Sequence, residues 1–127
     1  MEFLMDTHTL LWYFKGDKLL SSTALKTIQN PSMIFYISSA SIWEIAIKVS
    51  LNKLVLNRPI DKYIDAIRNE GFIILAIQEK DFITVSQLPF HHKDPFDRMI
   101  IAQAMNSKLS IISKDEIFKN YGLDVIW

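Results

Sequence analysis

The sequence contains no cysteine, and it has only three glycines and four prolines among its 127 residues. The absence of cysteine excludes disulfide bonds and thiolate metal sites. Neither the P-loop pattern nor the dinucleotide-binding pattern of glycines occurs. The chain also has no repeat and no low-complexity tract. These absences leave a compact domain whose chemistry rests on oxygen and nitrogen side chains.

An excess of one charge is also missing, since Lys plus Arg and Asp plus Glu both number 14. Zero net charge argues against a protein that holds nucleic acid through bulk positive charge, but it leaves room for a local basic rim. No apolar run approaches the roughly 18 residues of a membrane span, and the N-terminal MEFLMD lacks the pattern of a signal peptide. We therefore expect a soluble cytoplasmic protein without membrane association.

The length and the hydrophobic content of 50% predict one domain, residues 1–127, with a buried core. Five short apolar runs are typical of strands: residues 2–6, 33–37, 72–77, 109–113 and 124–127. Helical patterns separate them, at residues 7–16, 21–30, 39–51, 59–71, 79–87, 95–108 and 117–121. Because the strands are apolar throughout and alternate with helices, we predict an α/β fold: a three-layer α/β/α sandwich with a mostly parallel central sheet.

In such folds the functional site lies outside the carboxyl ends of the strands. Asp6 ends the first predicted strand, Asp115 follows the fourth, and Glu44 lies in the first turns of the helix after the second. The helix that leads into the fourth strand begins at the same edge, which places Asp97 there as well. Four acids from separate segments are thus predicted to converge.

Each acid also has a structural interpretation. Ser41 and Glu44 fit a capping box, and Glu44 and Lys48 have the spacing of a helical ion pair. Asp94 fits an N-cap, with Asp97 at a position favoured by the helix dipole. The other two acids fit turns or caps. A single acid is therefore weak evidence of function, and the convergence of four is stronger.

Carboxylates crowded without matching cations repel one another and raise one another's pKa, so such a cluster requires a cation. An all-oxygen site suits a hard divalent ion such as Mg²⁺, which in this setting activates water for attack on a phosphodiester. The cluster therefore predicts a metal-dependent phosphodiesterase. Its metal ligands and catalytic residues are predicted to be Asp6, Glu44, Asp115 and one aspartate of the DPFD segment, Asp94 or Asp97.

Four segments occur in the order and spacing of a known family: FLMDTHTLLW, ISSASIWEIAIK, HHKDPFDRMIIAQA and SIISKDEIFKNYG. They resemble the PIN domain, and most of all the toxin ribonucleases of VapBC-type toxin–antitoxin modules. The resemblance covers nearly the whole chain and implies a Mg²⁺- or Mn²⁺-dependent endoribonuclease of RNase H-like topology. It further implies a homodimer and a small antitoxin partner whose tail blocks the site.

Matched by position, Asp6, Glu44 and Asp115 correspond to the family's first, second and fourth acids. Thr7 corresponds to the hydroxyl residue that follows the first acid. Ser113 corresponds to a small hydroxyl residue that supports the site. The resemblance therefore adds Thr7 and Ser113 to the predicted site as supporting residues.

The resemblance implies a third acid at the start of a helix, three residues before an apolar residue and just ahead of a stretch of small residues. Asp97 fits this pattern, so we predict it, rather than Asp94, as the third metal ligand and catalytic residue. Asp97 shares a helical face with Ile100, Ile101 and Ala104, which aims it at the sheet edge. Asp94 lies outside the helix proper and is interpreted as the cap or an outer-sphere helper.

Several basic residues lie near the predicted site. Lys48, Arg98 and Lys114 are candidates for contacts with RNA. His91 and His92 precede the key helix, but a hard-metal site does not need imidazole, and we leave both out of the predicted site.

Two other functions fit the same architecture. A phospho-acceptor receiver domain also gathers acids at this edge, but it requires an aspartate at the end of the third strand, where this chain has Gln78. A catalytically silent interaction or RNA-binding module of PIN fold would be expected to lack one of the four acids, and all are present. The apolar N-terminal helices, residues 7–16 and 21–30, additionally favour a homodimer.

Overall fold

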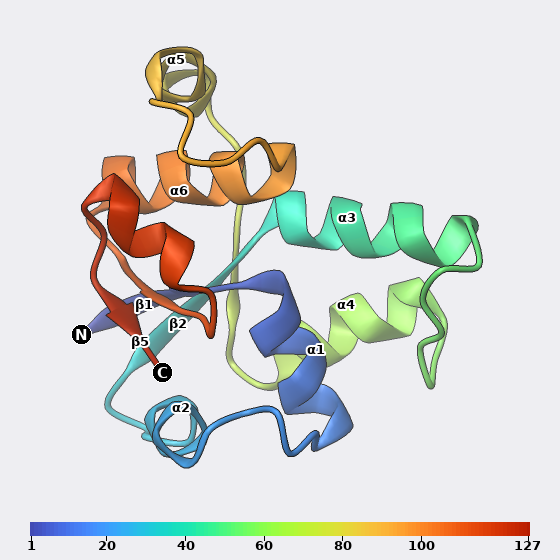
Figure 1. The fold of residues 1–127 in the computed structure, drawn as a ribbon. Coiled ribbons are helices and arrows are strands. Elements are labelled where there is room, and N and C mark those ends of the chain that lie inside the picture. Colours follow the sequence, from blue (N-terminus) through green and yellow to red (C-terminus); the bar gives the residue numbers. More distant parts are fainter.

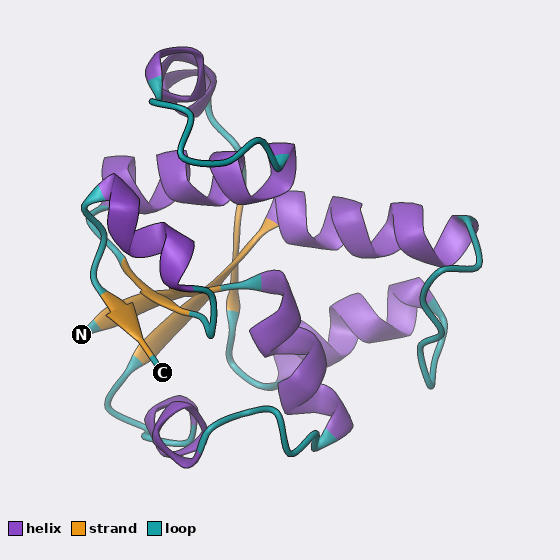
Figure 2. Cartoon of the chain, in the orientation of Figure 1, coloured by secondary structure: helices purple, strands orange, loops and turns teal.

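The computed structural model describes residues 1–127 and contains a five-stranded sheet with helices on both faces (Figure 1, Figure 2). The strands are β1 (Glu2–Met5), β2 (Ile34–Ser38), β3 (Ile73–Leu75), β4 (Ser110–Ile112) and β5 (Val125–Ile126). The α-helices are α1 (Thr7–Lys15), α2 (Ser22–Ile28), α3 (Ser39–Ser50), α4 (Ile60–Asn69), α5 (Glu79–Gln87) and α6 (Pro95–Ser107), and a 3₁₀ helix, η1, spans Glu116–Tyr121. Every predicted strand is present, although most are shorter than predicted. None of the helices has the length and apolar character that a membrane crossing requires.

All paired strands run parallel, in the order β3-β2-β1-β4-β5. The chain moves outward from β1 through β2 to β3 and then returns to place β4 on the other side of β1. β1 and β4 therefore flank the point at which the strand order reverses. Ligand sites in open parallel sheets lie at such a point, beyond the carboxyl ends of the strands. The predicted sandwich is confirmed, and its sheet is parallel throughout.

Alternate residues of β1 serve the two faces of the sheet, as the pleat of a strand requires. Phe3 and Met5 belong to a buried cluster that includes residues of α1, α2 and α4, whereas Leu4 belongs to a second cluster with α6 and η1. The helices of the two clusters lie on opposite sides of the sheet in Figure 1. Burial on both faces explains why the strands have continuous apolar sequences, and it fixes the carboxyl end of β1 in the middle of the molecule.

The apolar residues of α1 are used mainly within the chain. Leu10 is buried, and Leu11, Tyr13 and Phe14 pack against the first cluster. The core therefore explains the apolar content of this helix. The apolar residues of this helix therefore no longer favour a homodimer, which stays a prediction based on the family resemblance.

The predicted capping box of Ser41 and Glu44 is wrong. α3 follows β2 directly, and its N-cap is Ser38, whose Oγ accepts a hydrogen bond from the Ala40 N–H at 3.0 Å. Ser41 lies inside the helix, where its Oγ accepts a hydrogen bond from Thr7 Oγ1 at 2.8 Å. Because the helix begins three residues earlier than the capping box requires, the Glu44 side chain is free for another role.

Candidate active site

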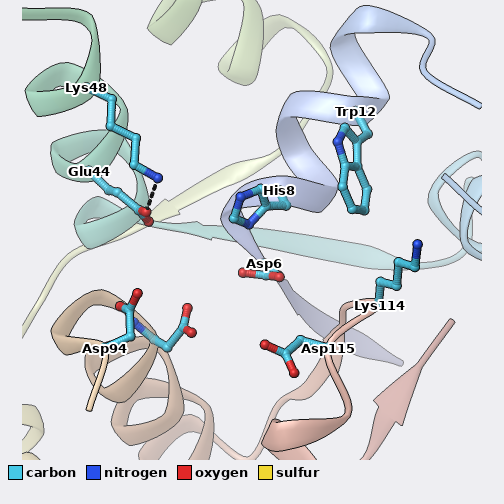
Figure 3. Close-up of a pocket in the computed structure, with 9 residues that line it drawn as sticks. Asp6, His8, Trp12, Glu44, Lys48, Asp94, Lys114 and Asp115 are labelled. Atoms are coloured by element: carbon cyan, nitrogen blue, oxygen red, sulfur yellow. Dashed lines mark hydrogen bonds and ion pairs between the residues drawn. The ribbon is translucent and has the colours of Figure 1, made fainter. Parts of the chain in front are cut away.

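A pocket of about 360 Å³ opens at the carboxyl edge of the sheet, where β1 and β4 end (Figure 3). Its lining consists of carboxylates, basic side chains and the apolar Trp12: Asp6, His8, Trp12, Glu44, Lys48, Asp94, Asp97, Lys114 and Asp115. Figure 3 shows the labelled acids approaching from the end of β1, from α3, from the start of α6 and from the segment after β4. The structure thus brings the four predicted acids together with Asp94.

Asp6 lies at the centre of the site. It is the N-cap residue of α1, yet its side chain makes no capping hydrogen bond. Its Oδ2 instead accepts a hydrogen bond from Ser113 Oγ at 2.8 Å, and Ser113 Oγ accepts one from the Asp115 N–H at 3.0 Å. Burial raises the pKa of the Asp6 carboxyl, against the lowering effects of Ser113 and the nearby His8. Ser113 therefore links the ends of β1 and β4.

Thr7, predicted as a supporting residue, is not among the residues that line the pocket. It is buried, and its hydroxyl donates to Ser41 on α3, so the hydroxyl holds α1 against α3. Its contribution to the pocket is structural, because it fixes the start of the helix that follows Asp6.

Glu44 is buried, and Lys48 Nζ donates a hydrogen bond to Glu44 Oε2 at 2.8 Å (Figure 3). The predicted ion pair between these residues is confirmed. Lys48 is the one lysine paired with a carboxylate of the pocket, and Lys114 is the other lysine that lines it, so the carboxylates of the pocket outnumber its lysines.

The DPFD segment divides its two aspartates between two tasks. Asp94 is the N-cap of α6, and its Oδ1 accepts hydrogen bonds from the N–H groups of Phe96 and Asp97, both at 2.9 Å. The predicted capping role of Asp94 is confirmed. Asp97 makes no capping bond; its Oδ2 lies 3.2 Å from His92 Nε2.

Burial and the crowding of carboxylates in the pocket together have a large effect on the pKa of Asp97. Burial, followed by the charges of Asp6, Asp94, Glu44 and Asp115, raises the pKa of the Asp97 carboxyl from 3.8 to about 8. Carboxylates that repel one another in this way are stabilised by any cation that enters the pocket. Asp115 completes the set from the segment after β4, where its Oδ1 also accepts a hydrogen bond from the Ile117 N–H at 3.0 Å.

The donor chemistry of the pocket fits a hard divalent ion, because its acidic ligand candidates are all oxygen donors and the chain has no thiol. No three of the acidic and histidine side chains lie close enough together to form a complete metal-binding group. The fit therefore rests on the charge and the donor type of the pocket rather than on preformed coordination geometry.

The prediction that Arg98 contacts RNA is wrong. Its side chain is buried, with Nη1 donating to the Pro89 carbonyl at 2.8 Å and Nη2 to the Leu88 carbonyl at 3.2 Å. The guanidinium carbon lies 4.0 Å from the ring centroid of Phe90. A planar guanidinium suits such a cluster of carbonyls, and this one anchors the segment after α5 to α6.

Sequence reasoning missed two residues near the acids. His92, which was left out, contacts Asp97, and His8 lines the pocket beside Trp12. The position of His92, five residues before Asp97 and outside the helix, has no helical periodicity that could have linked the two. His8 follows Asp6 by two residues at the start of a helix, so its proximity was a readable signal.

A parallel α/β/α sandwich with an acid-lined pocket at its switch point defines the structural class of this protein. The PIN domain family matches residues 3–123, and the chain therefore belongs to the PIN domain family. The predicted resemblance to this family is confirmed. No curated protein sequence matches the chain.

Three solved structures illustrate the similarity of the fold. One is a chain of VapBC2 from Rickettsia felis, in a complex bound to a DNA fragment of its promoter. The two chains are 12% identical with a TM-score of 0.75, and the match covers 99% of this chain and 98% of that chain. A chain of DNA-bound VapBC from Salmonella typhimurium has a TM-score of 0.73 and 17% identity, and the match covers 99% of this chain and 97% of that chain. A chain of a toxin–antitoxin complex from Klebsiella pneumoniae has a TM-score of 0.68 and 20% identity, and the match covers 98% of this chain and 96% of that chain. At these identities the similarity establishes the fold.

Proposed function

We propose that this protein is a cytoplasmic, metal-dependent endoribonuclease, the toxin of a toxin–antitoxin pair, which hydrolyses RNA phosphodiester bonds at the acidic pocket. The observation that carries the proposal is the convergence of five carboxylates on one pocket: Asp6, Glu44, Asp94, Asp97 and Asp115. Burial, and then the charges of the other four, raise the pKa of Asp97 there. A folded chain retains such repulsion at a cost in stability, and functional sites are where that cost is commonly found.

The residues that would hold the ion are Asp6, Glu44, Asp97 and Asp115, and Mg²⁺ or Mn²⁺ suits their oxygen donors. When bound, such an ion supplies Lewis-acid activation of water and of the phosphoryl oxygen. Ser113 orients Asp6 through its hydrogen bond, and Lys48 holds Glu44 in the same way. Asp94 serves the site indirectly, since it fixes the first turn of the helix that carries Asp97.

The rim of the pocket offers contacts for the substrate. Lys48 and Lys114 line it and are suited to phosphate groups. Trp12 lines it as well, and its ring provides a surface on which a base can stack. These three residues supply a local basic and aromatic rim on a chain whose net charge is zero. The choice of RNA over DNA rests on the family resemblance.

A groove beside the pocket supports an antitoxin partner. It has a volume of about 420 Å³ and shares His8, Trp12 and Lys48 with the acidic pocket. More than half of its lining is hydrophobic, including the exposed Val55. A peptide segment seated there through apolar side chains would reach the carboxylates, and a basic residue at its end would neutralise them. The similar structures named above contain VapBC or toxin–antitoxin complexes, which agrees with such a partner.

The proposed nuclease activity is tested by incubating purified protein, free of any antitoxin, with single-stranded RNA and with DNA of the same sequence. We expect RNA cleavage with Mg²⁺ or Mn²⁺ and none in excess EDTA, with Ca²⁺ a poor substitute because its coordination is larger and looser. Undiminished RNA cleavage in EDTA would contradict the metal-dependent mechanism. An absence of cleavage with every ion would favour the catalytically silent module instead. Light scattering of the same sample should show a homodimer.

A further inference from the structure

A continuous set of contacts connects Asp97 to the buried Arg98 by way of two aromatic side chains. His92 Nε2 lies 3.2 Å from Asp97 Oδ2, and His92 Nδ1 lies 2.8 Å from the hydroxyl oxygen of Tyr121. The same hydroxyl oxygen lies 3.3 Å from Arg98 Nη1 and 3.3 Å from the backbone nitrogen of His92. None of these contacts is used by the proposed mechanism, and His92 is not among the residues that line the pocket.

Counting donors and acceptors around the Tyr121 hydroxyl determines the direction of each hydrogen bond. The Arg98 guanidinium and the backbone N–H of His92 can only donate, so both donate to the phenol oxygen and occupy its two lone pairs. The phenol proton is then directed at its remaining partner, Nδ1 of His92. A proton on Nδ1 would leave the oxygen facing three donors. Nδ1 is therefore the acceptor.

An imidazole that accepts at Nδ1 carries its proton on Nε2. The Nε2–H group of His92 accordingly donates to Asp97 Oδ2. No hydrogen bond within the chain engages the other oxygen of Asp97, Oδ1. The result is a carboxylate held by one oxygen and left with the other available, which is the arrangement that a ligand to an ion needs.

We propose that Arg98 and Tyr121 fix His92 in its Nε2–H tautomer, and that His92 is a positioning residue that orients the Asp97 carboxylate toward the ion-binding pocket. The orientation half of this proposal rests on the proposed function, whereas the tautomer follows from the hydrogen bonds alone.

The side chains of Arg98 and Tyr121 are held in place by their own surroundings. Arg98 cannot turn away, because its guanidinium is held by the carbonyls of Leu88 and Pro89 and packs on the ring of Phe90. Tyr121 is buried at the end of η1, and its ring stacks edge-on against His92 with centroids 5.5 Å apart. Tyr121 belongs to the buried cluster that packs on α6, and Arg98 is a buried residue of α6 itself, so the orientation of His92 depends on packing outside the pocket.

The tautomer is tested by NMR of uniformly ¹⁵N-labelled protein, in which long-range ¹H–¹⁵N correlations distinguish the protonated ring nitrogen. We expect the Nε2–H pattern for His92 in the wild type, recorded in EDTA so that no ion contributes. The Nδ1–H pattern, or a mixture of the two tautomers, would overturn this half of the proposal. In Tyr121→Phe, which removes the hydroxyl, the preference should be lost, and an unchanged Nε2–H pattern there would show that Arg98 and Tyr121 do not set it.

The positioning role is tested with two substitutions that each keep half of the imidazole's contacts. The amide nitrogen of His92→Gln can occupy the position of Nε2 and donate to Asp97, whereas the shorter amide of His92→Asn reaches the position of Nδ1 and can contact only Tyr121. We expect His92→Asn to weaken Mn²⁺ binding about 10-fold or more in calorimetry, and His92→Gln to restore most of it. His91→Gln changes an exposed neighbour whose ring packs edge-on against Tyr121 but whose side chain makes no hydrogen bond; it is the control for lost ring packing and should bind as the wild type does.

The Mn²⁺ binding of the two His92 variants can also contradict the positioning role. A role limited to holding the loop through Tyr121 predicts that His92→Asn binds normally and His92→Gln does not, and that result would overturn the positioning role. Equal loss in both variants would overturn it too, since it would remove the dependence on the Asp97 contact. Absence of Mn²⁺ binding in the wild type would contradict the proposed function and the positioning role together, whereas the spectrum in EDTA would still decide the tautomer.

Discussion

Two adjacent residues at the start of α6 place opposite charges in opposite environments. Arg98 has only 4% of its surface exposed, yet backbone carbonyls, a phenol oxygen and an aromatic face surround its guanidinium. Asp97 is partly buried in the same turn, and burial together with the charges of four other carboxylates raises its pKa to about 8. The chain surrounds the positive charge with hydrogen-bond acceptors, whereas it gives the negative charge one contact with His92 and four repelling carboxylates.

The difference between these two regions separates a structural charge from a functional one. A buried charge whose partners all belong to the chain stabilises a particular packing and needs nothing from outside. A charge that the chain itself opposes persists when something outside the chain supplies the balance, and we propose that a cation does so here.

The largest effect is expected on catalysis at the acidic side. Asp97→Asn and Glu44→Gln keep the size and polarity of each side chain but remove a charge, and RNA cleavage should fall by orders of magnitude. Neither should lose much stability, since no cap depends on either carboxylate. Cleavage rates and urea unfolding measured on the same preparations check this. Cleavage at the wild-type rate in both variants would end the assignment of the pocket as the active site.

The next largest effect is expected on stability at the basic side. Arg98→Met removes the guanidinium and leaves several buried carbonyls without a donor, so the free energy of unfolding should fall by about 3 kcal/mol. Arg68→Met, which alters an exposed arginine of α4, is the matched control and should change it by less than about 0.5 kcal/mol. Urea denaturation measures both. A similar small change in the two variants would mean that Arg98 does not anchor the segment after α5.

A smaller effect is expected from pH on the metal-free protein. Because the pKa of Asp97 is 3.8 in its ordinary state and about 8 in the fold, the folded protein holds a proton that the unfolded chain releases between these values. The contribution of this carboxyl to the free energy of unfolding should therefore be fully present below pH 3.8, and it should be lost as pH rises toward 8. Melting temperatures recorded in EDTA from pH 5 to about pH 8.5 test this, and Asp97→Asn should flatten the slope. A rise in stability over the same range would contradict the raised pKa.

The smallest effect is expected at Asp94, the cap. Asparagine caps helices as well as aspartate does, so Asp94→Asn should keep most of the activity and nearly all of the stability. Asp94→Ala removes the acceptor for the Phe96 and Asp97 N–H groups and should cost about 1 kcal/mol. Loss of cleavage in Asp94→Asn, with normal folding, would move the third acid of the site from Asp97 to Asp94.

The sheet and its functional edge could be predicted because they depend on local patterns. Continuous apolar runs specify buried parallel strands; Asp6 follows β1 directly, and Asp115 follows β4 after Ser113 and Lys114. The cap at Asp94 was readable for the same reason, since the residues involved are neighbours in sequence.

The errors all concern contacts between segments that lie apart in the sequence or choices among similar residues. Ser38 rather than Ser41 caps α3, in a serine-rich stretch where several residues offer the same oxygen. Arg98 was expected at the surface, but a loop from another helix closes over it. The link from Asp97 through His92 to Tyr121 spans 29 residues at its second step, and no periodicity encodes it.

The central claim, that the pocket is completed by a cation from outside the chain, is tested most directly by the unfolding free energy of the wild type and Asp97→Asn, each in EDTA and in millimolar Mn²⁺. The account predicts that the order reverses. In EDTA Asp97→Asn is at least as stable as the wild type because repulsion is relieved, and with Mn²⁺ the wild type is more stable because the ion binds the folded site. The same order under both conditions, with no response of the wild type to Mn²⁺, would contradict it.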